Sequence, residues 1–389
     1  MEFWSIFYLT MIVLLTLILL APEKQKRVLC YVLIFIIWFI GAFRYKIGEP
    51  DYNTYSNLYN IWDLFKYVDL WDVLFAHDVE PMFNIIVATL THLSMTSQSM
   101  FVLYYTITVV FLFMGLRRYS DNYDIMAVTL CLFLSFPAQG GYWWSFVFMR
   151  QAVAVSIVFW GASYIRHKAI VFLLATFVAV MFHYSAILGV LLLLMDKTAI
   201  STNKVCVLAC FGFILNAMGI MTDALLKILE YGSYIYGRYT GAILGAGSGV
   251  TLFSPMAAML TILYLMLRRY QIRDNLSPMI VNAASLYILL RVYMSFGSSN
   301  SGLGSVVHRF ETYFLLYFLL MISMGLTKLR NMNNISAIVK GVLVIGFVSM
   351  FCIMSLRNIA ISGGIADPFG NREVSSDNIN YEFNFDLFK

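Results

Sequence analysis

The segment QSMFVLYYTITVVFLFMGL (residues 98–116) has no charged side chain and is followed at once by Arg117 and Arg118. An apolar run of this length is what an α-helix needs to cross the hydrocarbon core of a bilayer. Other runs that reach or approach this length are spread over the whole chain: 3–21, 28–43, 125–140, 147–165, 205–221, 252–267, 277–296, 309–326 and 335–355. The sequence therefore predicts an all-α polytopic membrane protein that forms a single transmembrane domain over residues 1–389.

The stretch 169–195 is too long for one crossing and short for two. Because basic residues lie on both sides of it, we expect it to enter the membrane and return as a hairpin that turns near His183. With this hairpin the chain makes about 12 crossings, within a range of about 10 to 14. An even number of crossings places both termini on the same side.

The composition supports a membrane protein, since 61% of the residues are hydrophobic and only 12% are charged. Soluble domains carry about 25% charged residues. The five cysteines lie in apolar runs without the spacing of a metal site. Cys206 and Cys210 share one helix face, and we expect them to be buried small hydrophobic residues. The sequence predicts no disulfide, no metal and no cofactor.

The basic residues orient the chain. Six short loops and Lys340 hold 15 of the 26 Lys and Arg residues and 5 acidic residues, a net charge of +10. These loops are 22–27, 117–124, 166–168, 196–204, 268–274 and 328–334. The rest of the chain holds 11 basic and 16 acidic residues, a net charge of −5. The positive-inside rule places the first set in the cytoplasm, with both termini outside.

All the large loops then fall on the outer face: 44–97, 222–251, 297–308 and the tail 356–389. Within the first of them, the semi-apolar piece Pro81–Leu93 is predicted to be a re-entrant or interfacial helix, because a full crossing there would place Arg117 outside. The glycine-rich piece GAILGAGSG (241–249) is expected to be a flexible outer loop. Long loops in compact proteins usually carry function, so we expect the chemistry to face outward.

Several charged residues lie at or inside the outer ends of predicted spans: Arg44, Arg150, His183, Arg291, Arg309 and Glu311. An arginine at bilayer depth costs about 2.5–3.5 kcal/mol on insertion scales, and such residues usually face a cavity and mark a ligand path. Each arginine alone could instead extend to lipid phosphate or pair with a carboxylate, and His183 could be a hydrogen-bonded packing residue. Their agreement across separate helices favours a shared cationic chamber that opens outward.

Guanidinium groups bind phosphate through forked hydrogen bonds, so these arginines point to a diphosphate on a membrane lipid. A carboxylated ligand would fit the charges as well. The chain has no Walker lysine loop, no HExxH or Cys–His array and no GxSxG sequence, which argues against ATP hydrolysis, metal chemistry and a serine hydrolase. No repeat relates the two halves, and this weakens a transporter interpretation.

Three stretches together resemble a known family. FRYKIGEPDYNTYSNLY (43–59), followed by HDVEPMFNII (77–86), is similar to the first outer loop of the EpsG-like and Wzy-type polysaccharide polymerases. MRQAVAVSIVFWGASYIRHK (149–168), running into VAVMFHYSAILGVLLLL (178–194), resembles their Arg-Gln-x-x-Ala helix and Phe-His-x-Ser-Ala segment. VVHRFETYF (306–314) resembles a late Arg-Phe-x-x-Tyr element. In the first loop, Asp51 lies one residue further from its glycine than in the family pattern, and the tail matches only loosely.

The resemblance implies a C-type glycosyltransferase-like fold in the bacterial inner membrane. It implies that the growing glycan is transferred from undecaprenyl diphosphate onto the next lipid-linked repeat unit on the periplasmic face, as in lipopolysaccharide and other polysaccharide biosynthesis. The implied partners are these lipid-linked oligosaccharides, membrane lipids and a regulator of chain length. Neither a metal, a nucleotide sugar nor a nucleic acid is expected.

Breaking a sugar–diphosphate bond places negative charge on the leaving group, and preorganised cations stabilise that charge. We predict Arg150, Arg291 and Arg309 in this role. His183 is the predicted base for the attacking hydroxyl, because histidine titrates near neutrality. Glu80, Asp51 and Glu311 are alternative bases. The residues predicted to bind substrate are Arg44, Asp51, Tyr52, Tyr55, Glu80, Gln151, Glu311 and Tyr313.

Three other functions stay open at this point. An O-antigen ligase, which moves a finished glycan to lipid A core, would share the arginines and the fold. A flippase or other transporter of lipid-linked oligosaccharides would need a charged path that reaches both faces, whereas the charges here gather at one face. A membrane acyltransferase that uses His183 would need polar residues deep on the cytoplasmic side, and the sequence has none there.

Overall fold

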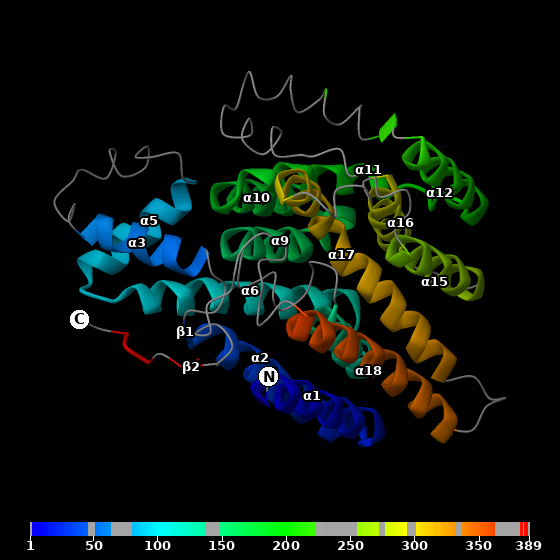
Figure 1. The fold of residues 1–389 in the computed structure, drawn as a ribbon, viewed down its shortest axis with the longest axis horizontal. Coiled ribbons are helices and arrows are strands. Elements are labelled where there is room, and N and C mark those ends of the chain that lie inside the picture. The colour runs from blue at the N-terminus through cyan, green and yellow to red at the C-terminus, as the bar shows by residue number, and fades with distance from the viewer. Residues whose placement is uncertain are drawn as a thin grey trace. The chain divides into compact units, whose positions relative to one another are not determined.

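The computed structural model describes residues 2–45, 51–63, 80–136, 148–218, 220–221, 227, 255–271, 277–293, 301–330, 337–361, 382–383 and 385–387. In this part of the chain there are fourteen α-helices, one 3-10 helix and two strands of two residues each (Figure 1). The chain divides into two compact units. Unit 1 is 1–190, 330–367 and 374–389, and unit 2 is 191–329 and 368–373.

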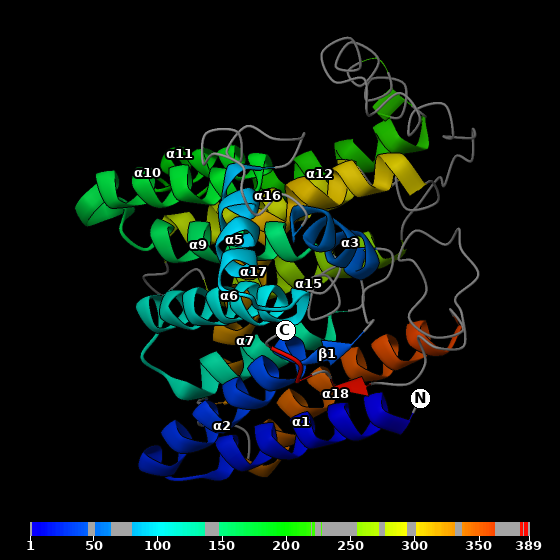
Figure 2. The ribbon, with the colours of Figure 1, turned by 90° about the vertical axis from the view of Figure 1, so that its left-hand side faces the viewer.

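Unit 1 contains most of the helices. They are α1 Glu2–Leu20, α2 Glu23–Ala42, α3 Asp51–Asp63, α5 Pro81–His92, α6 Ser97–Tyr119, α7 Tyr123–Ser135, α9 Met149–Ala162, α10 Ile165–Phe182, the 3-10 helix η1 Tyr184–Leu191 and α18 Ala337–Ile361. Figures 1 and 2 show α6, α9 and α10 side by side, while α1 packs against α2, α7 and α18.

Unit 2 is formed by α11 Leu192–Met195, α12 Thr202–Ala217, α15 Pro255–Gln271, α16 Pro278–Tyr293 and α17 Ser301–Arg330. Here α16 packs against α11, α12 and α15. Every apolar run predicted as a span corresponds to a helix in one of the two units, so the prediction of an all-α protein is confirmed for the described residues. The glycine-rich piece 241–249 lies outside them.

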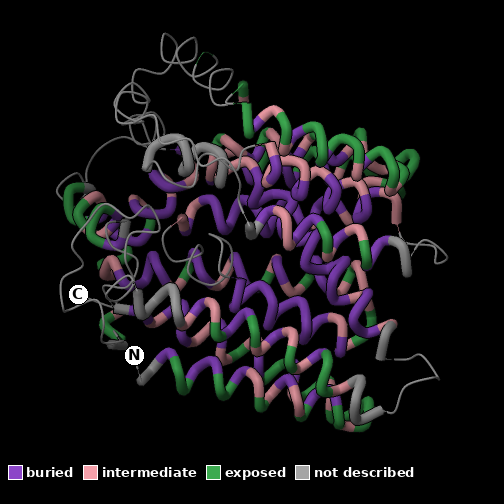
Figure 3. Tube along the Cα trace, turned by 45° about the vertical axis from the view of Figure 1, so that its right-hand side comes forward, coloured by how far each residue is buried: buried purple, intermediate pink, exposed green. Residues whose placement is uncertain are grey.

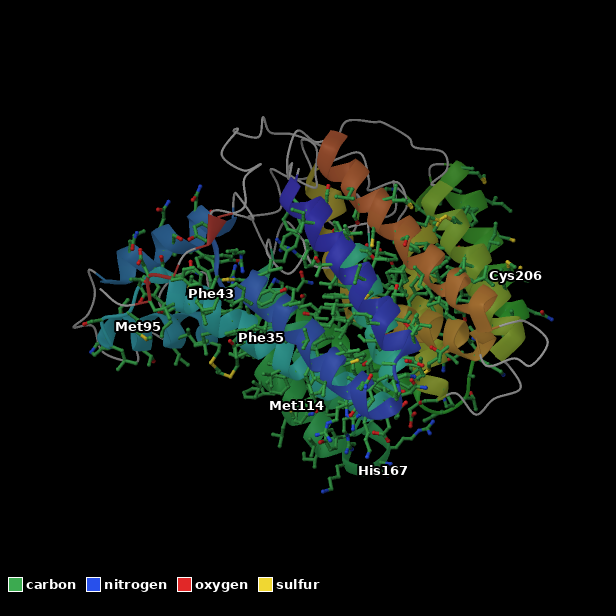
Figure 4. All side chains as sticks on the ribbon, turned by 90° about the horizontal axis from the view of Figure 1, so that it is seen from below. Phe35, Phe43, Met95, Met114, His167 and Cys206 are labelled. Carbon is green, nitrogen blue, oxygen red and sulfur yellow. The ribbon has the colours of Figure 1, made fainter. Side chains whose placement is uncertain are left out.

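Large apolar side chains cover the outside of the helices. Phe177 is 64% exposed, Val207 68% and Leu20 76%. Phe35 and Met114, labelled in Figure 4, are further examples. Figure 3 shows exposed and buried residues alternating along the helix that starts at the N-terminus. Water would not tolerate so much exposed apolar surface, whereas lipid does.

One sequence expectation is wrong on the lipid-facing side of unit 2. Cys210 of α12 is exposed and Cys206 (labelled in Figure 4) is half-buried, so neither is the buried small residue predicted. An apolar helix gives no clue from composition alone as to which of its faces meets lipid and which meets protein. Cys30, Cys131 and Cys352 are buried.

Within the described residues, four helices are long and apolar enough to cross a membrane: Glu23–Ala42, Ser97–Tyr119, Ile165–Phe182 and Arg309–Lys328. Shorter apolar helices occupy the other predicted spans among the described residues, α1 and α18 included. Twelve crossings and the C-type fold therefore stay predictions. The predicted helix at Pro81–Leu93 is present as α5, which begins with Pro81 and ends at His92.

The predicted reversal near His183 is seen in the structure. Helix α10 ends at Phe182, His183 adopts an extended backbone and η1 begins at the next residue. Gly189 of η1 then packs directly on Val158 of α9. His183 lies near the level of Arg150, at the start of α9, and Val158 lies two turns further along it. Thus η1 runs back along α9, in the direction opposite to α10.

The described C-terminal residues return to the segment that follows α2. Strand β2 (Glu382–Phe383) pairs antiparallel with β1 (Arg44–Tyr45), so that Arg44 lies opposite Phe383. The Leu387 carbonyl accepts hydrogen bonds from the Thr96 backbone N–H at 3.1 Å and from Ser99 Oγ at 2.6 Å. No side chain caps the first turn of α6. The bonds to Leu387 hold the C-terminal tail against the start of this helix.

Close approach of α9 and α10 depends on Gly161. A Cβ at this position would lie 2.6 Å from Ala175 Cβ, which is shorter than any relaxed contact. Gly161→Leu is expected to lower the free energy of unfolding by about 1–3 kcal/mol, the usual effect of overpacking. The measurement is the midpoint of heat-induced loss of folded protein in detergent. Gly346→Leu is the matched control, since its Cβ would have no atom within 4 Å. Equal midpoints for both variants would contradict the packing argument.

Candidate functional site: two arginine–carboxylate clusters

The first cluster lies in unit 1 and is centred on Glu80. This residue precedes Pro81, the first residue of α5, and the proline holds Glu80 in an extended conformation just outside the helix. Arg150, in the first turn of α9, donates from Nη1 to Glu80 Oε2. Its Nε donates to the Tyr55 hydroxyl of α3 at 3.1 Å. Three elements far apart in the sequence therefore hold one guanidinium group.

Aromatic rings enclose this guanidinium. Arg150 Cζ lies 5.3 Å from the centre of the Tyr55 ring and 5.6 Å from that of Phe83. The Tyr104 ring of α6 lies 6.3 Å from Phe83 and 5.8 Å from Phe182, and its hydroxyl is within electrostatic range of Arg150. The rings lower the local dielectric constant, so the charges inside the cluster interact more strongly than they would in water.

His183 joins the cluster from the turn after α10. Its Nε2 lies 4.0 Å from Glu80 Oε1. Its Nδ1 lies 2.7 Å from Ser185 Oγ and accepts from the Ser185 backbone N–H at 3.3 Å. The side chain of His183 is 13% exposed, and that of Glu80 is 8% exposed. The structure thus brings together four predicted site residues: Tyr55, Glu80, Arg150 and His183.

Arg44 and Tyr52, which were predicted to bind substrate, pack against α6 in the same unit. Arg44 is only 1% exposed, donates to the Gly41 carbonyl at 2.8 Å and lies 5.0 Å from the Phe101 ring centre. Tyr52 stacks on the same Phe101 ring, with the two ring centres 4.4 Å apart. Both side chains support helix packing here, and their binding of substrate stays a prediction. Gln151 is fully buried in α9, and the Asp51 side chain lies outside the described residues.

The second cluster lies in unit 2. Arg291, in the last turn of α16, contacts Glu311 of α17 with its Nη1 3.2 Å from Oε1. Glu311 is 3% exposed. Tyr287, one turn before Arg291, lies beside it and stacks on Phe318 at 4.9 Å. The pattern of the first cluster, an arginine with a carboxylate and a tyrosine, recurs.

Two other predicted residues belong to α17. Arg309 is the first residue of this helix whose side chain the structure describes. Tyr313 is 1% exposed. A shared chamber for Arg150, Arg291 and Arg309 would involve both units, and it stays a prediction.

One buried cation was not predicted. Arg268 is 6% exposed in α15, donates to the Tyr264 hydroxyl at 2.7 Å and to Ser285 Oγ at 3.3 Å, and also binds the Ile200 carbonyl. The sequence had placed it in a loop, 268–274, whereas α15 continues to Gln271. Nearby, Asn282 donates to the Met195 and Thr198 carbonyls at 2.7 Å each. Polar residues at helical spacing in α15 and α16 were the signal that could have revealed this cluster.

Among the described residues, no group of three His, Cys, Asp or Glu side chains is placed to hold a metal ion. Charged groups gather there as ion pairs instead, and in the two clusters each pair joins an arginine to a carboxylate. An arginine held beside a carboxylate and a tyrosine can exchange that carboxylate for an anionic ligand of the same forked geometry. The lipid-facing helices and these two clusters define a helical membrane protein that holds charged groups in its interior.

The comparisons with known proteins agree. The sequence model of the EpsG family matches residues 27–366. The chain belongs to the EpsG family, whose members are Wzy-like polysaccharide polymerases. The resemblance found in the motifs is therefore confirmed over most of the chain. No curated protein and no solved structure gives a significant match.

Proposed function

We propose that this protein joins lipid-linked oligosaccharide repeat units into a polysaccharide at the outer face of the bacterial inner membrane. The donor is a glycan on undecaprenyl diphosphate, and the acceptor is the next lipid-linked repeat unit. The observation that carries the proposal is the first cluster, in which Arg150 binds Glu80 and Tyr55 while His183 lies 4.0 Å from the same carboxylate.

Arg150 stabilises the leaving group. As the bond between the sugar and the diphosphate breaks, its electron pair stays on the diphosphate oxygen, and the guanidinium neutralises the growing charge. The enclosing rings of Tyr55 and Phe83 hold the guanidinium in place before substrate arrives. Such preorganisation is what makes a charged donor effective in the transition state.

Glu80 connects substrate binding with proton transfer. A diphosphate competes with the Glu80 carboxylate for Arg150, because both are anions that match its forked donors. The displaced carboxylate then lies beside His183, and this pair takes the proton of the attacking hydroxyl. Of the three alternative bases in the sequence, Glu80 is the one that the described contacts bring to His183.

The second cluster provides cations for the other lipid diphosphate. Two lipid-linked substrates must bind, and each carries a diphosphate. Arg291 is held by Glu311 beside Tyr287, as Arg150 is held by Glu80 beside Tyr55. Arg309 lies two residues before Glu311 in α17. This arrangement accounts for several arginines in a reaction that we expect to proceed without a metal.

The side of the membrane follows from the charges. The loops that carry a net charge of +10 are cytoplasmic by the positive-inside rule, which leaves Glu80, Arg150 and Arg291 near the outer ends of their helices. The pairing of β2 with β1 supports a C-terminal tail on the same face as the first outer loop.

Purified protein in detergent with undecaprenyl-diphosphate-linked repeat units tests the function. We expect a ladder of longer glycans and one undecaprenyl diphosphate released for each new bond, in the presence or absence of a chelator. The ladder should have uncontrolled lengths, since the proposed chain-length regulator is a separate protein. A flippase would form no longer glycan under these conditions. A ligase would form no ladder either, and cells without it would accumulate long lipid-linked chains instead of single repeat units.

A further inference from the structure

The hydrogen bonds of His183 determine which ring nitrogen carries its proton. A backbone N–H can only donate, so the bond from Ser185 N–H to Nδ1 at 3.3 Å requires a lone pair on Nδ1. Ser185 Oγ, 2.7 Å from the same atom, is then a second donor to it. In a neutral imidazole with an unprotonated Nδ1, the proton lies on Nε2. This is the nitrogen that faces Glu80 Oε1 at 4.0 Å.

We infer that Ser185 is a positioning residue, which keeps the His183 proton on Nε2, the nitrogen that faces Glu80 at 4.0 Å, and so leaves the Glu80 carboxylate as the proton acceptor of the reaction. This assignment rests on the proposed function. It differs from the sequence-based preference for His183 as the base. No role had been predicted for Ser185, which lies in the 3-10 helix that follows the reversal.

The surroundings of Glu80 favour this division of roles. Its Oε2 accepts from Arg150, and its Oε1 faces the Nε2 of His183. In the part of the chain that the structure describes, Tyr55 of α3 and Tyr104 of α6 are further titratable groups at the cluster. Among the described groups of the cluster, the carboxylate is therefore the anionic acceptor, and it is the group suited to take the proton of a substrate hydroxyl that enters the cluster.

The proton balance of the transfer is simple. The acceptor hydroxyl oxygen forms the new bond to the donor sugar carbon, while the bond from that carbon to the diphosphate oxygen breaks and its electron pair stays on the diphosphate. The hydroxyl proton passes to the Glu80 carboxylate. His183 keeps its Nε2 proton throughout and holds the carboxylate in place once the diphosphate occupies Arg150.

The first test reads the tautomer directly. Protein carrying ¹³C,¹⁵N-labelled histidine is studied by solid-state NMR in bilayers without substrate, and the His183 signals are identified by their loss in His183→Gln, since the chain has five histidines. We expect the Nε2–H form. A His183 signal with the proton on Nδ1 would overturn the inference.

The second test compares two amides at position 183. Glutamine places its amide nitrogen near the position of Nε2 and keeps the donor to Glu80, whereas asparagine reaches only the position of Nδ1 and loses it. We expect His183→Gln to keep about a tenth of the wild-type kcat and His183→Asn to fall roughly 100-fold or more, as for lost proton-transfer geometry. Equal losses of kcat in the two variants would mean that His183 itself, and not Glu80, accepts the proton of the attacking hydroxyl.

The third test concerns Ser185. Ser185→Ala is expected to lower kcat about tenfold, the effect of losing one hydrogen bond in a charged network, with an unchanged KM. Ser185→Thr, which keeps the hydroxyl, should restore most of the rate. Ser163→Ala is the matched control, because among the described residues Ser163 Oγ donates to the Trp160 carbonyl of its own helix turn. A Ser185→Ala enzyme with wild-type kcat would remove Ser185 from the reaction.

The proposed function and this inference fail in different ways. The NMR spectrum needs no turnover, so an Nε2–H signal from a protein that makes no glycan would refute the polymerase and leave the hydrogen-bond assignment standing. An active polymerase with an Nδ1–H signal would refute the assignment alone.

Discussion

Arg150→Ala is expected to lower the rate of polymerisation roughly 10²–10³-fold, so that cells carrying the variant accumulate single lipid-linked repeat units. An effect of this size is typical when one preorganised donor to a developing anion is removed. Arg150 is the cation whose surroundings are best defined, with Glu80 and Tyr55 as hydrogen-bond partners and two rings beside it. Arg150→Lys should recover little, because a lysine cannot form the forked contact.

The same substitution also leaves Glu80 buried without Arg150 beside it, and a buried charge that has lost its partner lowers the stability of the folded protein. The two effects separate in the double variant Arg150→Met/Glu80→Gln, which removes both charges and keeps the volumes. We expect its folded amount in detergent to return toward that of the wild-type protein while its activity stays absent. If the double variant recovers activity together with folding, the pair is structural and Arg150 has no part in catalysis.

Local features of the fold were predictable from the sequence. The run 98–116 became α6, Ser97–Tyr119, and the piece beginning at Pro81 became α5. Apolar length and a proline at a helix start depend on neighbouring residues alone, and so the sequence carries them directly. The reversal at His183 was predictable for the same reason, since this polar residue interrupts a long apolar run that has basic residues at both of its ends.

The partners of the charged residues could not be predicted. Glu80 and Arg150 are separated by 70 residues, and they meet because α5 packs against α6 and α10, both of which pack against α9. Arg309 and Glu311 are close in sequence, but residues two apart in a helix point in different directions. Glu311 instead contacts Arg291 of α16. The sequence singled out charged residues that the structure holds in ion pairs, but it did not show which of them pair with one another.

Arg268 shows a different limit. Counting basic residues by loops orients a membrane protein well, but it treats every arginine near a span end as solvated. Arg268 stays inside α15, where Tyr264, Ser285 and the Ile200 carbonyl bind it. Arg44 likewise is enclosed by aromatic rings of α6. Whether an arginine faces substrate or packing depends on tertiary neighbours that no local pattern encodes.

Arg291→Ala is expected to stop chain growth as fully as Arg150→Ala, with single repeat units as the product. Arg291 is held by Glu311 and lies beside Tyr287, so its guanidinium is fixed before a diphosphate arrives. Losing such a fixed donor lowers the rate roughly 10²–10³-fold. The measurement is the glycan ladder formed per unit of folded protein, which corrects for any loss of stability when Glu311 is left without Arg291.

Arg268→Ala provides the contrast within the same unit, because Arg268 is also buried but binds only helix and loop groups in the described contacts. We expect it to reduce the amount of folded protein and to leave the activity of the folded fraction close to that of the wild-type protein. Arg117→Ala, which breaks an ion pair with the exposed Asp121, should change neither. If Arg291→Ala behaves like Arg268→Ala, with normal activity in the folded fraction, the second cluster is a packing device and the polymerase must bind its second diphosphate elsewhere.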